Sequence, residues 1–339
     1  MIAPLSASTV SLIIPVYNGG EKFAKCLAAV QALSPAPDEV IVVADGDTDG
    51  SRHIAASFGL RVLKRPAPEG PARARNQAAR LATADLLFFT DADVTLPIDA
   101  IARVKAAFSK DPGLEALIGS YDAAPAEMNF LSQYKNLLHH YVHQTANRSA
   151  STFWGACGVI RREVFLKLGG FDERYRRPSV EDIALGYRLK KAGHRILLLK
   201  ELQVKHLKNW GVVSLLKSDI FDRALPWTDL ILSEGRWVAD LNLRLSSRVS
   251  VVAVLVLIAS LAGSLASAWM LIPSLLMALL LVALNLDFYR FLARRHGLIF
   301  SLKSIPWHWL YFFYSGLAFA VGLAKHRLRR LRAQEATAR

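Results

Sequence analysis

Cysteine is scarce in this chain of 339 residues. Its two cysteines are Cys26 and Cys157, with no Cys-x-x-Cys spacing, which argues against a disulfide framework and against a structural zinc site. The N-terminal sequence also lacks the basic patch and apolar core of a signal peptide. We therefore expect the N-terminal region to remain in the reducing cytosol.

Charged side chains are missing from residues 249–286. As one helix this stretch would measure about 57 Å, whereas the apolar core of a bilayer is about 30 Å thick. We therefore expect a transmembrane helical hairpin over residues 249–288 that turns near residues 269–273. Arginines flank the hairpin on both sides, namely Arg244 and Arg248 before it and Arg290, Arg294 and Arg295 after it. By the positive-inside rule, this pattern predicts a multi-pass protein of the cell (inner) membrane with its N-terminal domain in the cytosol.

The formal net charge of +14 includes basic clusters beside apolar runs. This arrangement favours anchoring to a membrane with anionic lipid over binding of nucleic acid. An amphipathic stretch that contains Trp227 is typical of helices at the lipid interface. The expected order after residue 210 is amphipathic juxtamembrane helices at 211–248, the hairpin at 249–288, a basic cytosolic loop at 289–303, a third membrane segment at 304–324 that either spans or is re-entrant, and a basic tail at 325–339.

The first third of the chain alternates short apolar runs with amphipathic stretches. Runs such as VIVV and LLFF consist of the aliphatic and aromatic residues expected of strands buried on both faces. Their alternation with helical patterns predicts βαβ units around a mostly parallel sheet. We therefore expect an α/β domain over residues 1–210.

Polar motifs follow three of these runs, namely PVYN from Pro15, ADGDTDGS from Ala44 and DAD from Asp91. Ligands of such sheets bind beyond the carboxyl ends of the strands, so these motifs should lie together. Further along the chain are FWGACGVIRREVF, GGFDE, VEDIALGYRLKKAGHRI and VKHLKNW. Taken in this order, residues 10–232 resemble a family 2 glycosyltransferase of the Rossmann-like GT-A fold. The resemblance implies a nucleotide-diphosphate sugar as donor, with a UDP-sugar favoured, and a divalent cation, Mg²⁺ or Mn²⁺, as cofactor.

The resemblance also implies roles for single residues. It assigns the metal to Asp93, with His206 completing the site, because hard divalent ions prefer carboxylate and phosphate oxygens. Without the resemblance, two aspartates after a strand would equally suit a turn or a helix cap. The positions implied in donor binding are Pro15, Tyr17, Asp45, Arg75, Asp91, Trp154 and Gly155. Among them, Tyr17 would stack on the base, Asp45 would accept a hydrogen bond from it, and Arg75 would favour anionic groups.

Glu181 and Asp182 open a predicted helix, where the N-terminal dipole favours ionised carboxylates and where helix capping is the simpler alternative. The resemblance implies that Asp182 is the general base of an inverting transfer and that Glu181 supports it. An acceptor hydroxyl must lose its proton as it attacks, whereas a polyprenyl phosphate is already ionised. We therefore expect transfer of a single sugar to a hydroxyl of a membrane lipid, with a polyprenyl phosphate as the alternative acceptor.

Other functions fit the motifs less well. A nucleotidyltransferase would need an arginine in the loop after the first strand, and PVYNGGEKF has none. A non-catalytic scaffold that binds sugar nucleotides would be free to lose its carboxylates, which are retained here. Pro226 stands where processive members of the family have arginine, so repeated polymer synthesis is disfavoured. The histidines at 139, 140 and 143 have no carboxylate at a matching offset and indicate a half-buried helix near the membrane, not a metal site.

Overall fold

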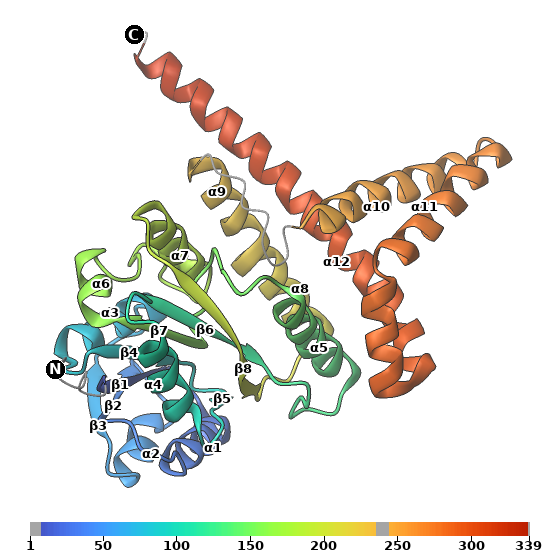
Figure 1. Ribbon diagram of the computed structural model, residues 1–339. Helices are drawn as coiled ribbons and strands as arrows, with labels where there is room; N and C mark the ends of the chain where they lie inside the picture. Colours follow the sequence, from blue (N-terminus) through green and yellow to red (C-terminus); the bar gives the residue numbers. More distant parts are fainter. Residues whose placement is uncertain (1–7, 235–243, 338–339) are drawn as a thin grey trace. The chain divides into compact units, whose positions relative to one another are not determined.

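The computed structural model describes residues 8–234 and 244–337, and the chain divides into two compact units, Met1–Trp210 and Gly211–Arg339 (Figure 1). The first unit is built on an eight-stranded sheet with the strand order β3-β2-β1-β4-β7-β6-β8-β5. Its strands are β1 (Val10–Val16), β2 (Glu39–Asp45), β3 (Arg61–Arg65), β4 (Leu86–Thr90), β5 (Val94–Thr95), β6 (Ala116–Tyr121), β7 (Cys157–Arg161) and β8 (Ile196–His206). The four strands β1 to β4 are joined by parallel pairs, as expected for βαβ units.

The other half of the sheet contains the antiparallel pairs, but the sheet as a whole is mostly parallel, as expected, because β6 and β8 run in the same direction as β1 to β4. Strand β7 runs antiparallel to both β4 and β6, and β5 runs antiparallel to β8. Cys157, the first residue of β7, pairs with Thr90, the last residue of β4. The chain therefore enters β7 at the carboxyl edge of β4, and this reversal brings Trp154 and Gly155 to the same edge as the DAD motif.

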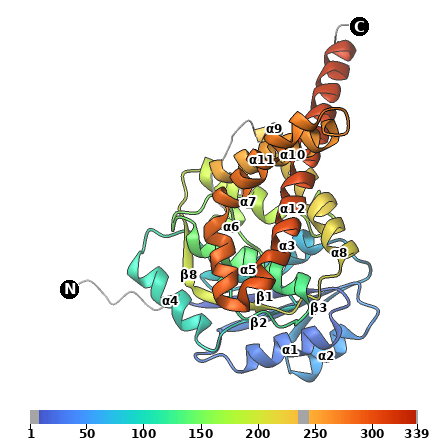
Figure 2. The ribbon, with the colours of Figure 1, turned by 90° about the vertical axis from the view of Figure 1, so that its right-hand side faces the viewer.

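Helices cover both faces of the sheet (Figure 2). They are α1 (Gly20–Gln31), α2 (Ser51–Ser57), α3 (Pro71–Leu81), α4 (Ala100–Lys110), α5 (Phe130–Thr145), α6 (Arg162–Lys167) and α7 (Glu181–Lys191). Phe23 of α1 and Phe108 of α4 pack with Leu12 and Phe88 in one fully buried cluster. The neighbouring Phe89 points the other way, because side chains alternate along a strand, and its ring meets those of Phe165 and Phe171.

The second unit is helical. Its elements are α8 (Val212–Lys217), a π-helical turn η1 (Ser218–Ala224), α9 (Leu225–Glu234), α10 (Leu245–Gly263), a short 3₁₀ turn η3 (Ala268–Met270), α11 (Leu271–Leu284) and α12 (Leu286–Thr337). Pro226 cannot donate a backbone hydrogen bond, and the π-helical turn ends two residues before it. Of the predicted juxtamembrane helices, residues 235–243 lie outside the described part of the chain.

The apolar part of this unit differs from the expectation in two details. The predicted hairpin turns between Gly263 and Leu271, earlier than expected, because Pro273 lies in the first turn of α11, where a missing N–H is tolerated. Residues 289–303 form helix on both sides of Gly297 instead of a loop. Apart from Gly297 this segment contains neither Pro nor Gly, so the helix breaks only there. Residues 304–324 lie inside the long second part of α12.

Length and composition allow one described helix, Leu245–Gly263, to cross a membrane. Its mean hydropathy over an 18-residue window is 2.1. The bent pair Ala268–Leu284 and Leu286–Arg329 passes the same test when the two helices are taken together. Up to two spans are therefore compatible with the described residues.

Candidate active site

The carboxyl edge of the sheet gathers most of the predicted site. Tyr17 follows β1 with 55% of its surface exposed, and Asp91 and Asp93 follow the end of β4. The DAD loop is itself anchored, because the backbone N–H of Val94 donates to the carbonyl of Asp91 (3.1 Å). Because it is exposed, the Tyr17 ring is accessible to a ligand. Pro15, in contrast, is buried within β1 opposite Val43. The expected donor contact of Pro15 is therefore not available, because its ring faces the core.

Asp93 and His206 are brought together by an antiparallel pair of strands. Val94 of β5 pairs with His206 of β8, and the N–H of Leu207 donates to the carbonyl of Asp93 (2.8 Å). This register leaves Asp93 Oδ2 and His206 Nε2 3.6 Å apart, with both side chains largely covered. Burial alone would raise the pKa of Asp93, but the hydrogen bond and charge of His206 hold the pKa below its ordinary value. Lys208 and Lys22 lower it further, so this corner has an ionised carboxylate among cationic groups.

Arg75 is not available to an incoming phosphate. Its guanidinium is buried, with Nη2 donating to Asp91 Oδ1 (2.6 Å) and Nη1 donating to Glu181 Oε1 (3.0 Å). This corrects the predicted contact of Arg75 with the sugar donor, because two carboxylates already offset the cost of burying the charge of its guanidinium. Arg75 instead ties the DAD loop to the start of α7, so that two acidic motifs 90 residues apart in sequence share one cation.

Asp182 lies beside this buried ion pair at the start of α7. Its Oδ2 accepts a hydrogen bond from the N–H of Gly155 (3.0 Å), and its Oδ1 accepts one from the N–H of Ile183 (2.8 Å). Burial, followed by the negative charge of Glu181, raises the pKa of Asp182 to about 7. A side chain at Gly155 would meet the Arg75 guanidinium at 3.1 Å. Glycine at this position therefore lets the backbone approach both Arg75 and Asp182.

Asp45 also differs from its predicted role. It is buried, its Oδ2 accepts from the N–H of Gly70 (2.8 Å), and its Oδ1 lies 2.9 Å from Arg65 Nε. Glu69 donates a third hydrogen bond from its N–H (3.2 Å). Burial raises the pKa of Asp45 although Gly70 and Arg65 oppose this. Asp45 thus holds the loop before α3. Its oxygens already accept several hydrogen bonds and have little capacity left to accept another from a nucleobase.

An aromatic cluster links Trp154 to His206, and the sequence did not indicate it. The Tyr121 ring stacks on the His206 ring, with centroids 4.7 Å apart and planes 12° apart. Trp154 meets Tyr121 edge to face at 4.7 Å and His143 at 5.1 Å. The one available signal was that Tyr121 ends an apolar run, LIGSY, as Tyr17 does. The stacking restricts how the His206 imidazole can turn.

The polar face of α5 explains how Tyr121 is held. Asn136 Nδ2 donates to the carbonyl of Asp122 (2.8 Å), His140 Nδ1 lies 2.8 Å from the carbonyl of Tyr121, and Ser132 Oγ accepts from the N–H of Trp210 (2.7 Å). Spaced four residues apart, these side chains occupy one side of the helix. Near Ser120 the β6–β8 register shifts, which leaves backbone groups for α5 to satisfy. The predicted histidine-bearing helix is therefore buried against the sheet.

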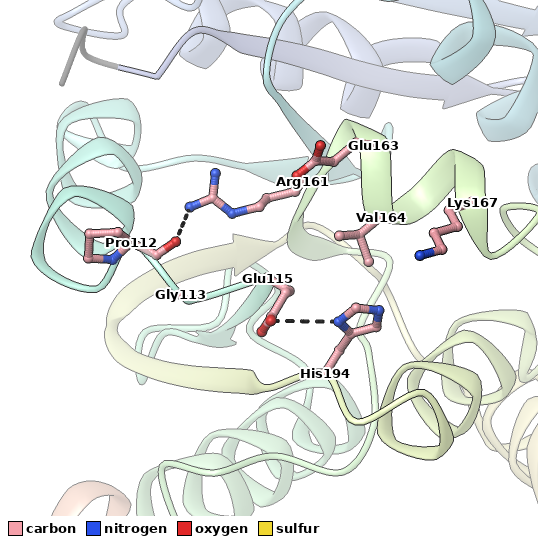
Figure 3. Close-up of a pocket in the computed structure, with 8 residues that line it drawn as sticks. All are labelled: Pro112, Gly113, Glu115, Arg161, Glu163, Val164, Lys167 and His194. Atoms are coloured by element: carbon pink, nitrogen blue, oxygen red, sulfur yellow. Dashed lines mark hydrogen bonds and ion pairs between the residues drawn. The ribbon is translucent and has the colours of Figure 1, made fainter.

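A separate cavity of about 490 Å³ lies at the opposite edge of the sheet (Figure 3). Arg161 in its wall pairs with Leu86 at the start of β4, whereas the DAD motif follows the end of β4. Glu115 and His194, also in the wall, lie 3.6 Å apart, and Arg161 donates to the carbonyl of Pro112 (2.7 Å). None of the predicted site residues lines this cavity, so it is separate from the candidate active site at the carboxyl edge.

Comparison with known proteins agrees with this geometry. Residues 11–169 match the model of the family described as Glycosyl transferase family 2. This segment is similar to a family 2 glycosyltransferase domain. The validoxylamine A glucosyltransferase of Streptomyces hygroscopicus subsp. limoneus is 26% identical over 252 residues, which cover 62% of this chain and 54% of the relative. The O-antigen chain rhamnosyltransferase WbaN of Salmonella anatum is 27% identical over 219 residues, which cover 59% and 66%.

The glycosyltransferase domain also has structural neighbours. The mannosyltransferase PcManGT from Pyrobaculum calidifontis, solved in complex with GDP-Man and Mn²⁺, superimposes with a TM-score of 0.58 at 20% identity. That superposition covers 94% of this chain and 88% of the neighbour. At this identity the likeness shows a shared α/β fold of the GT-A kind. The chain spans about half the length of the curated glucosyltransferase.

The glycosyltransferase domain contains two side chains that fit the coordination of a divalent cation. No group of three or more His, Cys, Asp or Glu side chains gathers around a possible ion in the described residues. Asp93 and His206 nevertheless converge, and the ionised state of Asp93 suits a hard cation. Two protein ligands are sufficient where a diphosphate and water complete the coordination, as is usual for Mg²⁺ bound with substrate phosphates.

Proposed function

We propose that the chain transfers a single sugar, with inversion, from a nucleotide-diphosphate sugar to a membrane lipid hydroxyl. The observation that supports this most is Asp182, a carboxylate with a raised pKa held at the same edge as Asp93. A base with a pKa near the working pH is efficient in both accepting and releasing a proton. The neighbouring carboxylate of Glu181 is committed to Arg75 and acts by raising the pKa of Asp182.

In the proposed reaction the acceptor hydroxyl gives its proton to an oxygen of Asp182 as its own oxygen attacks the anomeric carbon. The bond from this carbon to the diphosphate oxygen breaks, and the nucleoside diphosphate leaves with the bonding electron pair. A cation bound by Asp93 and His206 would stabilise the charge that develops on the leaving diphosphate. The exposed ring of Tyr17 is suited to stacking on the nucleobase, and Trp154 to contacting the sugar.

The second unit supports a membrane location for the acceptor. Its α10–α11 hairpin has small polar side chains inside, where Ser274 Oγ donates to Ser260 Oγ (2.8 Å) and Asn285 Nδ2 donates to Ser250 Oγ (3.1 Å). The outward side chains are large and apolar, such as Val252 of α10, which is 61% exposed, and Leu279 of α11, which is 58% exposed. Apolar side chains outside with hydrogen-bonded small residues between the helices suit lipid as the surrounding solvent. The 19 residues of α10 fall within the range of roughly 17–25 residues that a transmembrane helix needs.

We also propose that the hairpin anchors the catalytic unit on the cytosolic side of the cell membrane. Arg244 and Arg248 lie at the start of α10, and Arg290 follows the end of α11. Both ends of the hairpin are thus basic and would stay in the cytosol. This is also the compartment that holds nucleotide sugars.

Membranes that contain the chain should transfer radiolabel from a panel of UDP-, GDP- and dTDP-sugars into lipid extracts in the presence of Mn²⁺. The relatives named above transfer different sugars, so the panel is needed to identify the donor. Stability of the product to mild acid distinguishes a glycoside of a hydroxyl from a sugar phosphodiester, which mild acid cleaves. Label in an acid-labile lipid would support a polyprenyl phosphate acceptor instead. Donor binding without release of nucleotide or label would favour a non-catalytic scaffold.

A further inference from the structure

The helix α12 doubles back on itself at Gly297. This glycine has φ 86° and ψ 165°, a conformation that L side chains rarely adopt. Beyond it, Ser301 Oγ donates to the carbonyl of Tyr289 (2.8 Å), and His308 Nδ1 lies 3.2 Å from Tyr289 Oη. Tyr289 and His308 would be about 28 Å apart along a straight helix. Residues 286–296 therefore form an antiparallel pair with the following part of α12.

The inside of this pair is closed by its own side chains. Buried residues on its inner face include Phe288, Leu292, Ser304 and His308. The turn between the two helices is different, because Leu298, Ile299 and Leu302 are 66%, 71% and 54% exposed. These three apolar side chains take no part in the inner packing, although turns normally expose polar residues.

Basic side chains surround this apolar turn. Arg294 and Arg295 precede it and Lys303 follows it, and all three are exposed. The nearby acid Asp287 lies 3.7 Å from Arg290 and does not neutralise the three cations. We call the six residues Arg294, Arg295, Leu298, Ile299, Leu302 and Lys303 the α12 tip.

We propose that the α12 tip inserts into an anionic phospholipid surface. The proposal rests on the membrane anchor proposed above, since α12 begins two residues after α11 ends, which keeps the tip near the point where the hairpin leaves the bilayer. On the cytosolic leaflet, apolar side chains enter the interface while the cations meet anionic headgroups. A second copy of the chain is a poorer occupant, because two identical tips would bring like charges together.

The tip can be tested with a fluorescent probe on the full chain. Cys26 and Cys157 are both buried, so an environment-sensitive dye can be attached selectively to Leu298→Cys, and to Leu279→Cys inside α11 as the matched report on the hairpin. The proteins are reconstituted into vesicles of phosphatidylcholine alone or with phosphatidylglycerol, and lipids with brominated chains serve as quenchers. The dye at 298 should be quenched more strongly with phosphatidylglycerol, whereas the dye at 279 should be quenched in both.

A charge variant makes the test specific. Each basic residue near an anionic surface contributes about fivefold in binding, so Arg294→Gln with Arg295→Gln should reduce insertion of the tip about 25-fold and leave the dye at 279 unaffected. A dye at 298 that stays in water while the dye at 279 is quenched overturns the tip proposal and leaves the anchor intact. If neither dye is quenched, the anchor itself is refuted. Quenching at 298 that follows protein density and not lipid charge would assign the tip to a second copy, against the proposal.

Discussion

Replacing Asp182 with asparagine should separate sugar transfer from donor binding. Asparagine keeps the size of the side chain but cannot take a proton from the acceptor. Loss of a general base typically lowers the rate by 10² to 10⁴-fold, and transfer by Asp182→Asn should fall by about this factor. Donor affinity should change little, because the proposed donor contacts lie at Tyr17 and Asp93 instead.

The same substitution should alter stability in a way that depends on pH. The folded pKa of Asp182 is raised from the ordinary 3.8 to about 7, so the folded chain keeps a proton that the unfolded chain loses as pH rises. Wild-type stability therefore decreases between about pH 4 and pH 7, by at most about 4 kcal/mol at 1.36 kcal/mol per pKa unit. The stability of Asp182→Asn should not decrease in this way, because asparagine does not titrate. Only one of its two polar atoms can accept a hydrogen bond, so either Gly155 or Ile183 loses an acceptor at a cost of about 1–3 kcal/mol.

Asp182→Asn should consequently be less stable than wild type at pH 4 and comparable or more stable at pH 8. The assays are donor binding by calorimetry, transfer with the native lipid, and thermal unfolding in detergent across this pH range. Asp99→Asn provides a control, because this exposed carboxylate pairs with Arg103 (2.6 Å) on α4 and should leave transfer unchanged. Normal transfer by Asp182→Asn would refute the assignment of Asp182 as the general base and, with it, the argument for a hydroxyl acceptor. A stability difference that does not vary with pH would refute the raised pKa.

Three further predictions concern the ion site and its supports. Asp93→Asn should weaken Mn²⁺-dependent donor binding at least tenfold by calorimetry, and unchanged binding would remove Asp93 from the ion site. Arg75→Met leaves two carboxylates without their buried cation and should cost about 3–5 kcal/mol, seen as a large drop in melting temperature, and a drop of less than 2 °C would contradict the central role of this ion pair. Tyr121→Phe should retain Mn²⁺ affinity, whereas Tyr121→Leu should lower it by loosening His206, so equal affinities in the two variants would argue against positioning by the ring.

The sequence alone was sufficient for features that depend on local pattern. Uninterrupted apolar runs between amphipathic stretches predicted the parallel strands β1 to β4 and the helices between them, because burial and helical period are both visible in residue order. The ordered motifs indicated the glycosyltransferase family. The long uncharged segment indicated apolar helices, although its turn was expected near residues 269–273 and begins a few residues earlier, after Gly263. The roles of Asp93, Asp182 and His206 stay predictions.

The tertiary structure decided which side chains meet. Arg75 resembles a ligand-binding arginine in sequence, yet its guanidinium is paired with Asp91 and Glu181. A buried cation needs carboxylate partners, and the fold brings them from two distant segments. The reversal of β7 delivers Gly155 to Asp182, and the β5–β8 register places His206 beside Asp93. Strand direction and register depend on contacts between residues far apart in the chain, which residue order does not display. For the same reason the sequence could not show that Tyr121 stacks on His206.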